Sequence, residues 1–171
     1  MSKKVVFIIA QNNFQDQELA EPRNVLINRG MVVKIASVTK DRAIGKFGSI
    51  VNPDLAISEI KVADFSAIIF IGGSGAADYF NDHQILNLVR DFKSTGKVIA
   101  AICIAPSILA NAGVLIGKTV TAFSTEEDNL RNKGADYTGM SVEIDGNILT
   151  ARDAGSAKKF GEKIAFILEK D

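Results

Sequence analysis

The segment VIAAICIAP, residues 98–106, combines a buried strand with the first turn of a helix. Residues 98–102 are all apolar, which is typical of a strand in a parallel sheet that is covered on both faces. Pro106 suits the first turn of a helix, where no backbone N–H is needed. The segment therefore predicts a strand that turns directly into a helix, with Cys103 at the junction.

Similar apolar runs alternate with helical patterns along the chain, and residues 39–58 indicate a hairpin or arm. We predict strands at 5–10, 31–38, 67–71, 98–102, 119–123, 141–144 and 148–151, and helices at 14–29, 82–95, 104–113, 125–132 and 156–169. Such alternation predicts an α/β fold with a mostly parallel, doubly wound sheet and helices on both faces. With 171 residues, the chain suits a single domain, 1–171.

The composition excludes several classes of protein. Lys and Arg total 20, as do Asp and Glu, and this balance argues against nucleic acid or a membrane as the main partner. The first apolar run, residues 5–10, is too short for a signal peptide or a membrane span, so we expect a cytoplasmic protein. A single Cys excludes an intrachain disulfide.

Three segments are predicted to meet at the carboxyl ends of the strands. They are the loop 11–18, the glycine-rich loop 72–75 and Cys103. Ligands bind beyond this edge in open α/β sheets. We therefore expect a functional site where the three segments converge.

Cys103 is the first candidate residue of this site. The start of a helix offers free backbone N–H groups and a partial positive charge, which favour a thiolate. The backbone N–H groups of Gly73 and Ile104 are candidates for an oxyanion hole. The alternative is a small buried cysteine that packs as an apolar side chain.

Glu18 is the second candidate. It lies early in the first helix, and if buried and protonated it would donate a hydrogen bond to the thiolate. The alternative is an acidic residue that interacts only with the helix dipole. His83 is the sole histidine and is predicted at a surface helix start, so we expect no Cys–His dyad and no metal site. Asp78 replaces the third glycine of a dinucleotide motif in residues 73–78, so no nucleotide cofactor is expected.

Several motifs together resemble the PfpI/ThiJ family. This family belongs to the class I glutamine-amidotransferase-like superfamily and includes intracellular cysteine peptidases and the parkinsonism-associated protein deglycase. The resemblance rests on FQDQEL at 14–19 with Pro22, IGG at 71–73, AAIC at 100–103 with Ala105 and Pro106, AGVL at 112–115 with Gly117 and Lys118, and DGNILTAR at 145–152.

The resemblance implies a flavodoxin-like three-layer sandwich that forms a homodimer or a larger homo-oligomer. It implies that Cys103 is the nucleophile on the elbow, that Glu18 is the protonated carboxyl beside it, and that Gly73 lends an N–H to the oxyanion hole. It also implies cofactor-free activity on small aldehydes or glycated substrates (glyoxalase or deglycase activity), peptide hydrolysis, or a role in the stress response as a redox sensor or chaperone.

The chain departs from the family at three positions. Ile104 replaces the histidine that follows the nucleophile in the peptidase branch, Phe123 replaces a histidine of the deglycase branch, and Gln15 stands where Glu is frequent. We therefore expect a cysteine-dependent enzyme for reactive aldehydes or glycation adducts, acting through Cys103 and Glu18. A non-catalytic redox sensor or chaperone is the alternative, and a peptidase is the third hypothesis, which Ile104 argues against.

Overall fold

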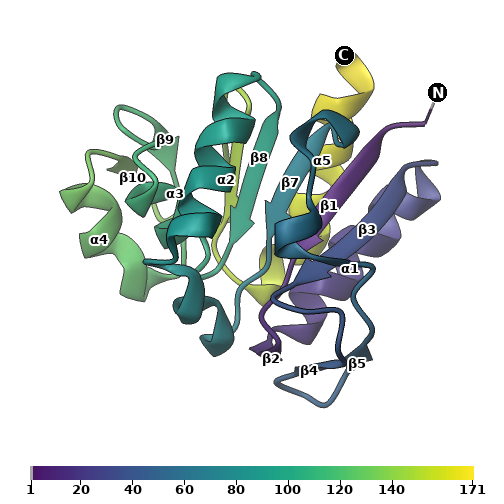
Figure 1. Ribbon diagram of the computed structural model, residues 1–171. Helices are drawn as coiled ribbons and strands as arrows, with labels where there is room; N and C mark the ends of the chain where they lie inside the picture. The colour runs from purple at the N-terminus through teal and green to yellow at the C-terminus, as the bar shows by residue number, and fades with distance from the viewer. Residues whose placement is uncertain (1) are drawn as a thin grey trace.

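A computed structural model describes residues 2–171. Its centre is a seven-stranded sheet (Figure 1). The strand order is β11-β12-β8-β7-β1-β3-β6, and all neighbouring strands are parallel except β11 and β12. The strands are β1 (Lys4–Ile8), β3 (Val32–Ser37), β6 (Leu55–Ala56), β7 (Ala67–Phe70), β8 (Val98–Ile102), β11 (Val142–Asp145) and β12 (Ile148–Ala151). The predicted mostly parallel α/β fold is confirmed.

Helices cover both faces of this sheet and complete a three-layer sandwich (Figure 1). One face packs against α1 (Asp16–Asn28) and α5 (Ala157–Lys170), and the other against α2 (His83–Ser94) and α3 (Pro106–Asn111). Side chains of a strand alternate between the two faces. Val5 and Phe7 of β1 thus join the core under α1 and α5, whereas Val6 and Ile8 join the core under α2 and α3.

Two small sheets flank the main one. The predicted arm is confirmed as an antiparallel hairpin of β4 (Ala43–Gly45) and β5 (Ile50–Val51), and β4 also pairs with β2 (Asn12–Phe14). The second is formed by β9 (Thr119–Val120) and β10 (Asp136–Tyr137), beside α4 (Glu127–Asn132). The short helical turns are η1 (Ile57–Glu59), η2 (Val62–Asp64), η3 (Ser74–Tyr79), η4 (Ser124–Glu126) and η5 (Ala154–Ser156).

The predicted strand 119–123 is wrong in its extent. Only Thr119 and Val120 form a strand, and they pair with β10 outside the main sheet. The backbone N–H of Thr121 donates to the Thr150 hydroxyl at 2.9 Å, and the N–H of Phe123 donates to the carbonyl of Cys103 at 2.8 Å. These bonds lead the segment away from a regular ladder and toward the end of β8.

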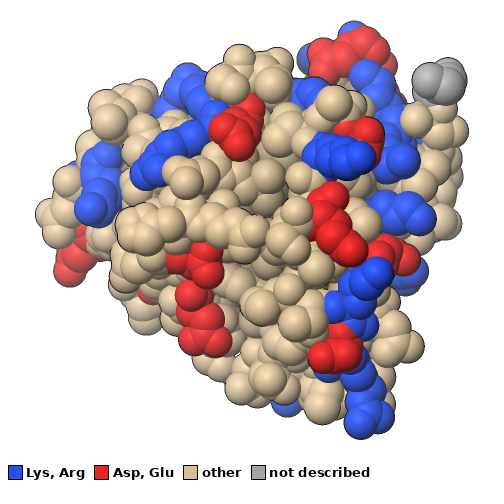
Figure 2. All heavy atoms as spheres, in the orientation of Figure 1, with Lys and Arg blue, Asp and Glu red and all other residues tan. Residues whose placement is uncertain are grey.

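The face drawn in Figure 2 carries Lys and Arg interspersed with Asp and Glu, between broad uncharged areas. No patch of one sign spans this face, as expected from the balanced composition. Within residues 2–171, no helix has the length and apolar character needed to cross a membrane.

Candidate functional site

The backbone at Cys103 adopts an unusual conformation. Its φ angle is 64°, in the left-handed region that costs a non-glycine residue about 1–2 kcal/mol. Two hydrogen bonds hold it there: its N–H donates to the carbonyl of Ala151 at 3.0 Å, and its carbonyl accepts from the N–H of Phe123 at 2.8 Å. The predicted elbow after β8 is therefore confirmed, and its strain is typical of functional positions.

Glu18 lies beside this elbow, in the first turn of α1. Gln15 caps the helix, because its side-chain oxygen accepts a hydrogen bond from the N–H of Glu18 at 2.9 Å. The Glu18 side chain is buried, with the residue only 1 % exposed, and its Oε1 accepts from the N–H of Gly72 at 3.0 Å. It is also hydrogen-bonded to the Cys103 side chain. The structure thus brings the two predicted residues together.

Two glycines after β7 make this approach sterically possible. A Cβ on Gly72 would lie 2.6 Å from Oε1 of Glu18 and 2.7 Å from Cβ of Cys103. Gly73 has a φ of +99°, and a Cβ there would overlap the backbone of the segment 13–15. Only glycine fits at either position.

The Glu18 carboxyl and the Cys103 thiol both have raised pKa values. Burial raises the pKa of Glu18 from 4.5 to about 7. Burial, and after it the negative charge of Glu18, raises the pKa of Cys103 from 9.0 to about 12. Because the groups are in contact, they titrate as a pair that loses its first proton near neutral pH and keeps the second far into the alkaline range.

Opposing effects act on the pKa of the Cys103 sulfur. The backbone N–H groups of Ile104 and Gly73 lie against the sulfur and lower its pKa. However, the expectation that the start of the helix leaves the thiol with a lowered pKa is wrong. Burial outweighs the two N–H groups, and α3 begins only at Pro106.

A pocket of about 580 Å³ opens over Cys103. Its lining includes the large apolar side chains of Phe80, Ile104 and Phe123. Charged side chains come from four separate segments: Glu18 from α1, Lys46 from the β4–β5 hairpin, Glu126 from η4 and Asp153 from the turn before η5. Sequence reasoning missed the last three, since no motif or spacing distinguishes them from other surface charges.

Other predicted features lie outside this pocket. His83 is exposed at the first position of α2, as predicted, and does not line the pocket. Residues 74–79 form the short helix η3 rather than a phosphate-binding loop that opens a long helix. Within residues 2–171, no group of three or more His, Cys, Asp or Glu side chains is arranged to hold a metal ion.

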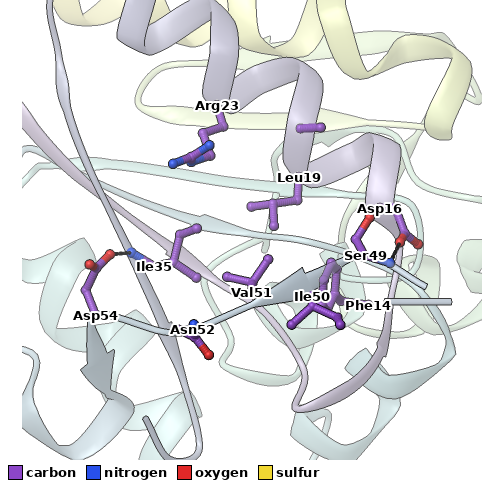
Figure 3. A pocket seen from close by; sticks show the side chains of 11 residues that line it. Phe14, Asp16, Leu19, Arg23, Ile35, Ser49, Ile50, Val51, Asn52 and Asp54 are labelled. Carbon is purple, nitrogen blue, oxygen red and sulfur yellow. Dashed lines mark hydrogen bonds between the residues drawn. The ribbon is translucent and has the colours of Figure 1, made fainter. Parts of the chain in front are cut away.

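A second pocket, of about 410 Å³, lies between α1, β3 and the β4–β5 hairpin (Figure 3). Leu19, Ile35 and Val51 point into it. The carboxylates at its edges are already bonded: Asp16 accepts from the N–H groups of Phe47 and Ser49, and Asp54 from that of Ile35. The residues that line this pocket include neither a cysteine nor a histidine, so the pocket over Cys103 is the candidate site.

Comparison with known proteins agrees with this geometry. The model of the DJ-1/PfpI family matches residues 3–166. The chain belongs to the DJ-1/PfpI family. The sequence resemblance is therefore confirmed over almost the whole length.

Three DJ-1/PfpI proteins illustrate the similarity. The Deglycase PfpI of Pyrococcus furiosus is 34% identical over 152 residues, which cover 89% of this chain and 91% of that protein. The crystal structure of a ThiJ/PfpI domain protein from Brachyspira murdochii has a TM-score of 0.97 at 30% identity, covering 99% of this chain and 98% of the other. Drosophila melanogaster DJ-1beta has a TM-score of 0.91 at 30% identity, covering 100% and 92%.

Proposed function

We propose that this DJ-1/PfpI protein is a cysteine-dependent enzyme that acts on reactive aldehydes or early glycation adducts. The observation that carries the proposal is a strained cysteine that faces an open pocket and is hydrogen-bonded to a buried glutamate. The relatives named deglycases support the same class of chemistry. A pocket of about 580 Å³ suits a small molecule.

The first chemical step is addition of the thiol to the aldehyde carbon of the substrate. The S–C bond forms, the C=O π bond breaks, and the thiol proton passes through Glu18 to the new hydroxyl. A carboxyl with a pKa of about 7 suits this transfer, because it is both a donor and an acceptor at neutral pH. The N–H groups of Gly73 and Ile104 would stabilise the developing oxyanion.

The test is turnover of methylglyoxal, with lactate as the measured product. We expect the wild-type protein to form lactate, and Cys103→Ala and Glu18→Gln to lose at least about 100-fold in kcat/KM. Glu21→Gln, on the same helix as Glu18 but outside the pocket, serves as the control and should be unchanged. Wild-type turnover no faster than that of Cys103→Ala would refute an aldehyde enzyme.

The second candidate is a redox sensor. Cys103 is the single cysteine and is partly exposed, and the groups that would stabilise an oxyanion would also stabilise a sulfinate. Peroxide titration followed by intact mass should then show two oxygens added at Cys103, with no addition in Cys103→Ser. A protein that stays unmodified at stoichiometric peroxide would contradict this role.

A peptidase has less support. The sole histidine, His83, does not line the pocket, so no imidazole stands beside the thiol as a general base. Cleavage of a fluorogenic peptide that is lost in Cys103→Ala would restore this third hypothesis.

We also propose that the protein acts in the cytoplasm as a homodimer or a larger homo-oligomer. The hairpin of β4 and β5 exposes apolar side chains, with Phe47 72 % exposed and Ile50 61 % exposed. Such a patch is typical of an interaction surface. Sedimentation of wild-type protein and of Phe47→Ser tests whether this hairpin mediates self-association.

A further inference from the structure

We infer that Glu126 is the second proton-transfer group of this site and moves a proton between two substrate carbons. The inference rests on the proposed aldehyde chemistry. It assigns a role that the missing histidines leave open, because Ile104 and Phe123 line the pocket where related proteins were expected to have imidazoles.

The Glu126 carboxylate is held in a defined position. Its Oε1 accepts from the hydroxyl of Ser107 at 2.7 Å, and its Oε2 accepts from the hydroxyl of Thr125 at 2.7 Å. Ser107 is fully buried in the first turn of α3, the helix that follows the Cys103 elbow. A carboxylate held at both oxygens in a substrate pocket is prepared for proton transfer.

The direction of the hydrogen bonds within this network is fixed. The amide nitrogen of Asn129 donates to Oγ of Ser107 at 3.1 Å and to the side-chain oxygen of Asn111 at 3.1 Å. The amide of Asn111 in turn donates to the carbonyl of Phe80 at 2.8 Å. Ser107 has a single proton, and because its oxygen already accepts from Asn129, that proton points to Glu126.

The other charged groups of the pocket are less suitable. Asp153 accepts from Ser156 and from Arg152, which lies 3.0 Å away, and these contacts hold the pKa of Asp153 below its usual value. A carboxylate paired with a cation is a poor proton acceptor. Lys46 has an ammonium group, which donates hydrogen bonds and accepts none. Glu126 is bonded to two neutral hydroxyls instead.

Glu18 already interacts with the backbone of Gly72 and the side chain of Cys103. Its residue is 1 % exposed, one oxygen accepts from the N–H of Gly72, and the side chain is hydrogen-bonded to Cys103. It is therefore placed to handle protons of the thiol and of the substrate oxygens. A separate group that lines the open part of the pocket is needed for the carbon-bound proton.

The proposed step balances without an external oxidant. Methylglyoxal bound to Cys103 is the hemithioacetal CH3–CO–CH(OH)–S. Glu126 removes the C1 proton, the C–H electron pair forms the C1–C2 double bond, the C2=O π pair moves to its oxygen, and that oxygen takes a proton from Glu18, so that an enediol results. Glu126 then returns the proton to C2, where the C1–C2 π pair forms the C–H bond, while the C1 hydroxyl loses its proton to Glu18 and its O–H pair forms the C=O bond of a thioester. C1 is thereby oxidised and C2 reduced, and water hydrolyses the thioester to lactate and the free thiol.

The experiment compares Glu126→Gln with Asp128→Asn, an exposed neighbour that loses the same charge outside the pocket. Glutamine preserves the acceptor for Ser107 and so preserves the fold. We expect Glu126→Gln to lose about 10²–10⁴-fold in kcat for lactate formation. Asp128→Asn should retain wild-type turnover.

A second measurement separates proton transfer from binding. Methylglyoxal should protect Cys103 from iodoacetamide equally well in wild type and Glu126→Gln, because addition of the thiol does not need Glu126. Ser107→Ala, which frees the carboxylate from its donor, should reduce kcat by a smaller factor than Glu126→Gln.

Three outcomes overturn the inference. Wild-type kcat in Glu126→Gln refutes the role of Glu126 alone and leaves the aldehyde enzyme intact. If Glu126→Gln loses both turnover and the protection of Cys103 by methylglyoxal, Glu126 has a role in binding the substrate instead. Absence of Cys103-dependent lactate formation in the wild type refutes the proposed function and the inference with it.

Discussion

At the scale of single residues, the chemistry of the site depends on how the Glu18 carboxyl and the Cys103 thiol titrate together. Glu18 and Cys103 are in contact, and burial raises the pKa of both. The carboxyl accepts one backbone N–H, from Gly72, whereas two backbone N–H groups lie against the sulfur. Both N–H groups lower the pKa of Cys103, but burial and the negative charge of Glu18 outweigh them, so Glu18 loses its proton first.

This coupling predicts the pH dependence of alkylation. We expect iodoacetamide to alkylate Cys103 slowly at neutral pH, with the rate rising only toward the thiol pKa of about 12. In Glu18→Gln the negative charge beside the sulfur is absent, so the midpoint should fall below the wild-type value, while burial keeps it above the ordinary thiol value of about 8.5. Intact mass against time at each pH gives the rates.

Asp128→Asn serves as the control for a lost charge and should keep the wild-type midpoint. A wild-type midpoint at or below about 8.5 would contradict the raised pKa of Cys103, and a higher midpoint in Glu18→Gln than in wild type would contradict the effect of the Glu18 charge.

The residues of the site differed in how well they could be predicted. Cys103 and Glu18 were predictable because each follows a buried strand, and parallel strands end at one edge. Gly73 and Ile104 followed from the same reasoning. Glu126 was not predictable, because its position depends on hydrogen bonds to Ser107 and Thr125 that link separate elements.

At the scale of elements, the ends of β7 and β8 must pack closely enough to bring the side chains of Glu18 and Cys103 into contact. Gly72 is the contact point, since Glu18 and Cys103 both occupy the space that a Cβ on this residue would need. Close packing of this kind leaves no room for an added methyl group.

Gly72→Ala should therefore disrupt the site. The new Cβ would lie 2.6 Å from the Glu18 carboxylate and 2.9 Å from the carbonyl of Ile102, so one of them must move. We expect a loss of about 1–3 kcal/mol in the free energy of unfolding, measured by urea denaturation.

Gly155→Ala is the matched control, because a Cβ there meets its nearest atom, on Asp153, at an ordinary 3.5 Å. If both substitutions had equal effects on stability, the close approach at Gly72 would not be limiting.

Secondary structure was most predictable where apolar runs were long. The strand 98–102 has the predicted bounds, because every residue in it is buried. The segment 119–123 was mispredicted, because its later residues bond to Thr150 and Cys103 instead of to a neighbouring strand. Such bonds come from tertiary packing and leave no pattern in the sequence.

At the scale of the whole molecule, buried Glu18 makes stability depend on pH. Its folded-state pKa of about 7 lies above the ordinary value of 4.5, so the folded protein binds more protons between these values. Stability is greatest while Glu18 is protonated in both states and falls as the pH rises from about 4.5 through 7. The full change is about 3 kcal/mol.

Glu18→Gln should remove the loss of stability that Glu18 causes as the pH rises. We expect the variant to have nearly wild-type stability at pH 4.5 and to be more stable at pH 8 by up to about 3 kcal/mol. Urea denaturation at several pH values gives the difference, with Glu21→Gln as a control for the same change on the same helix. A constant difference between wild type and Glu18→Gln across this range would contradict the raised pKa.

The three segments that surround the sulfur are far apart in the chain: Glu18, the Gly72–Gly73 pair, and Cys103 with Ile104. No short stretch of sequence contains them together, so the environment of the thiol exists only while the parallel sheet is assembled. An unfolded or truncated chain carries an ordinary thiol, with a pKa of about 8.5. The reactivity of this single cysteine thus reports, in one measurement on an unlabelled sample, what fraction of the molecules is folded.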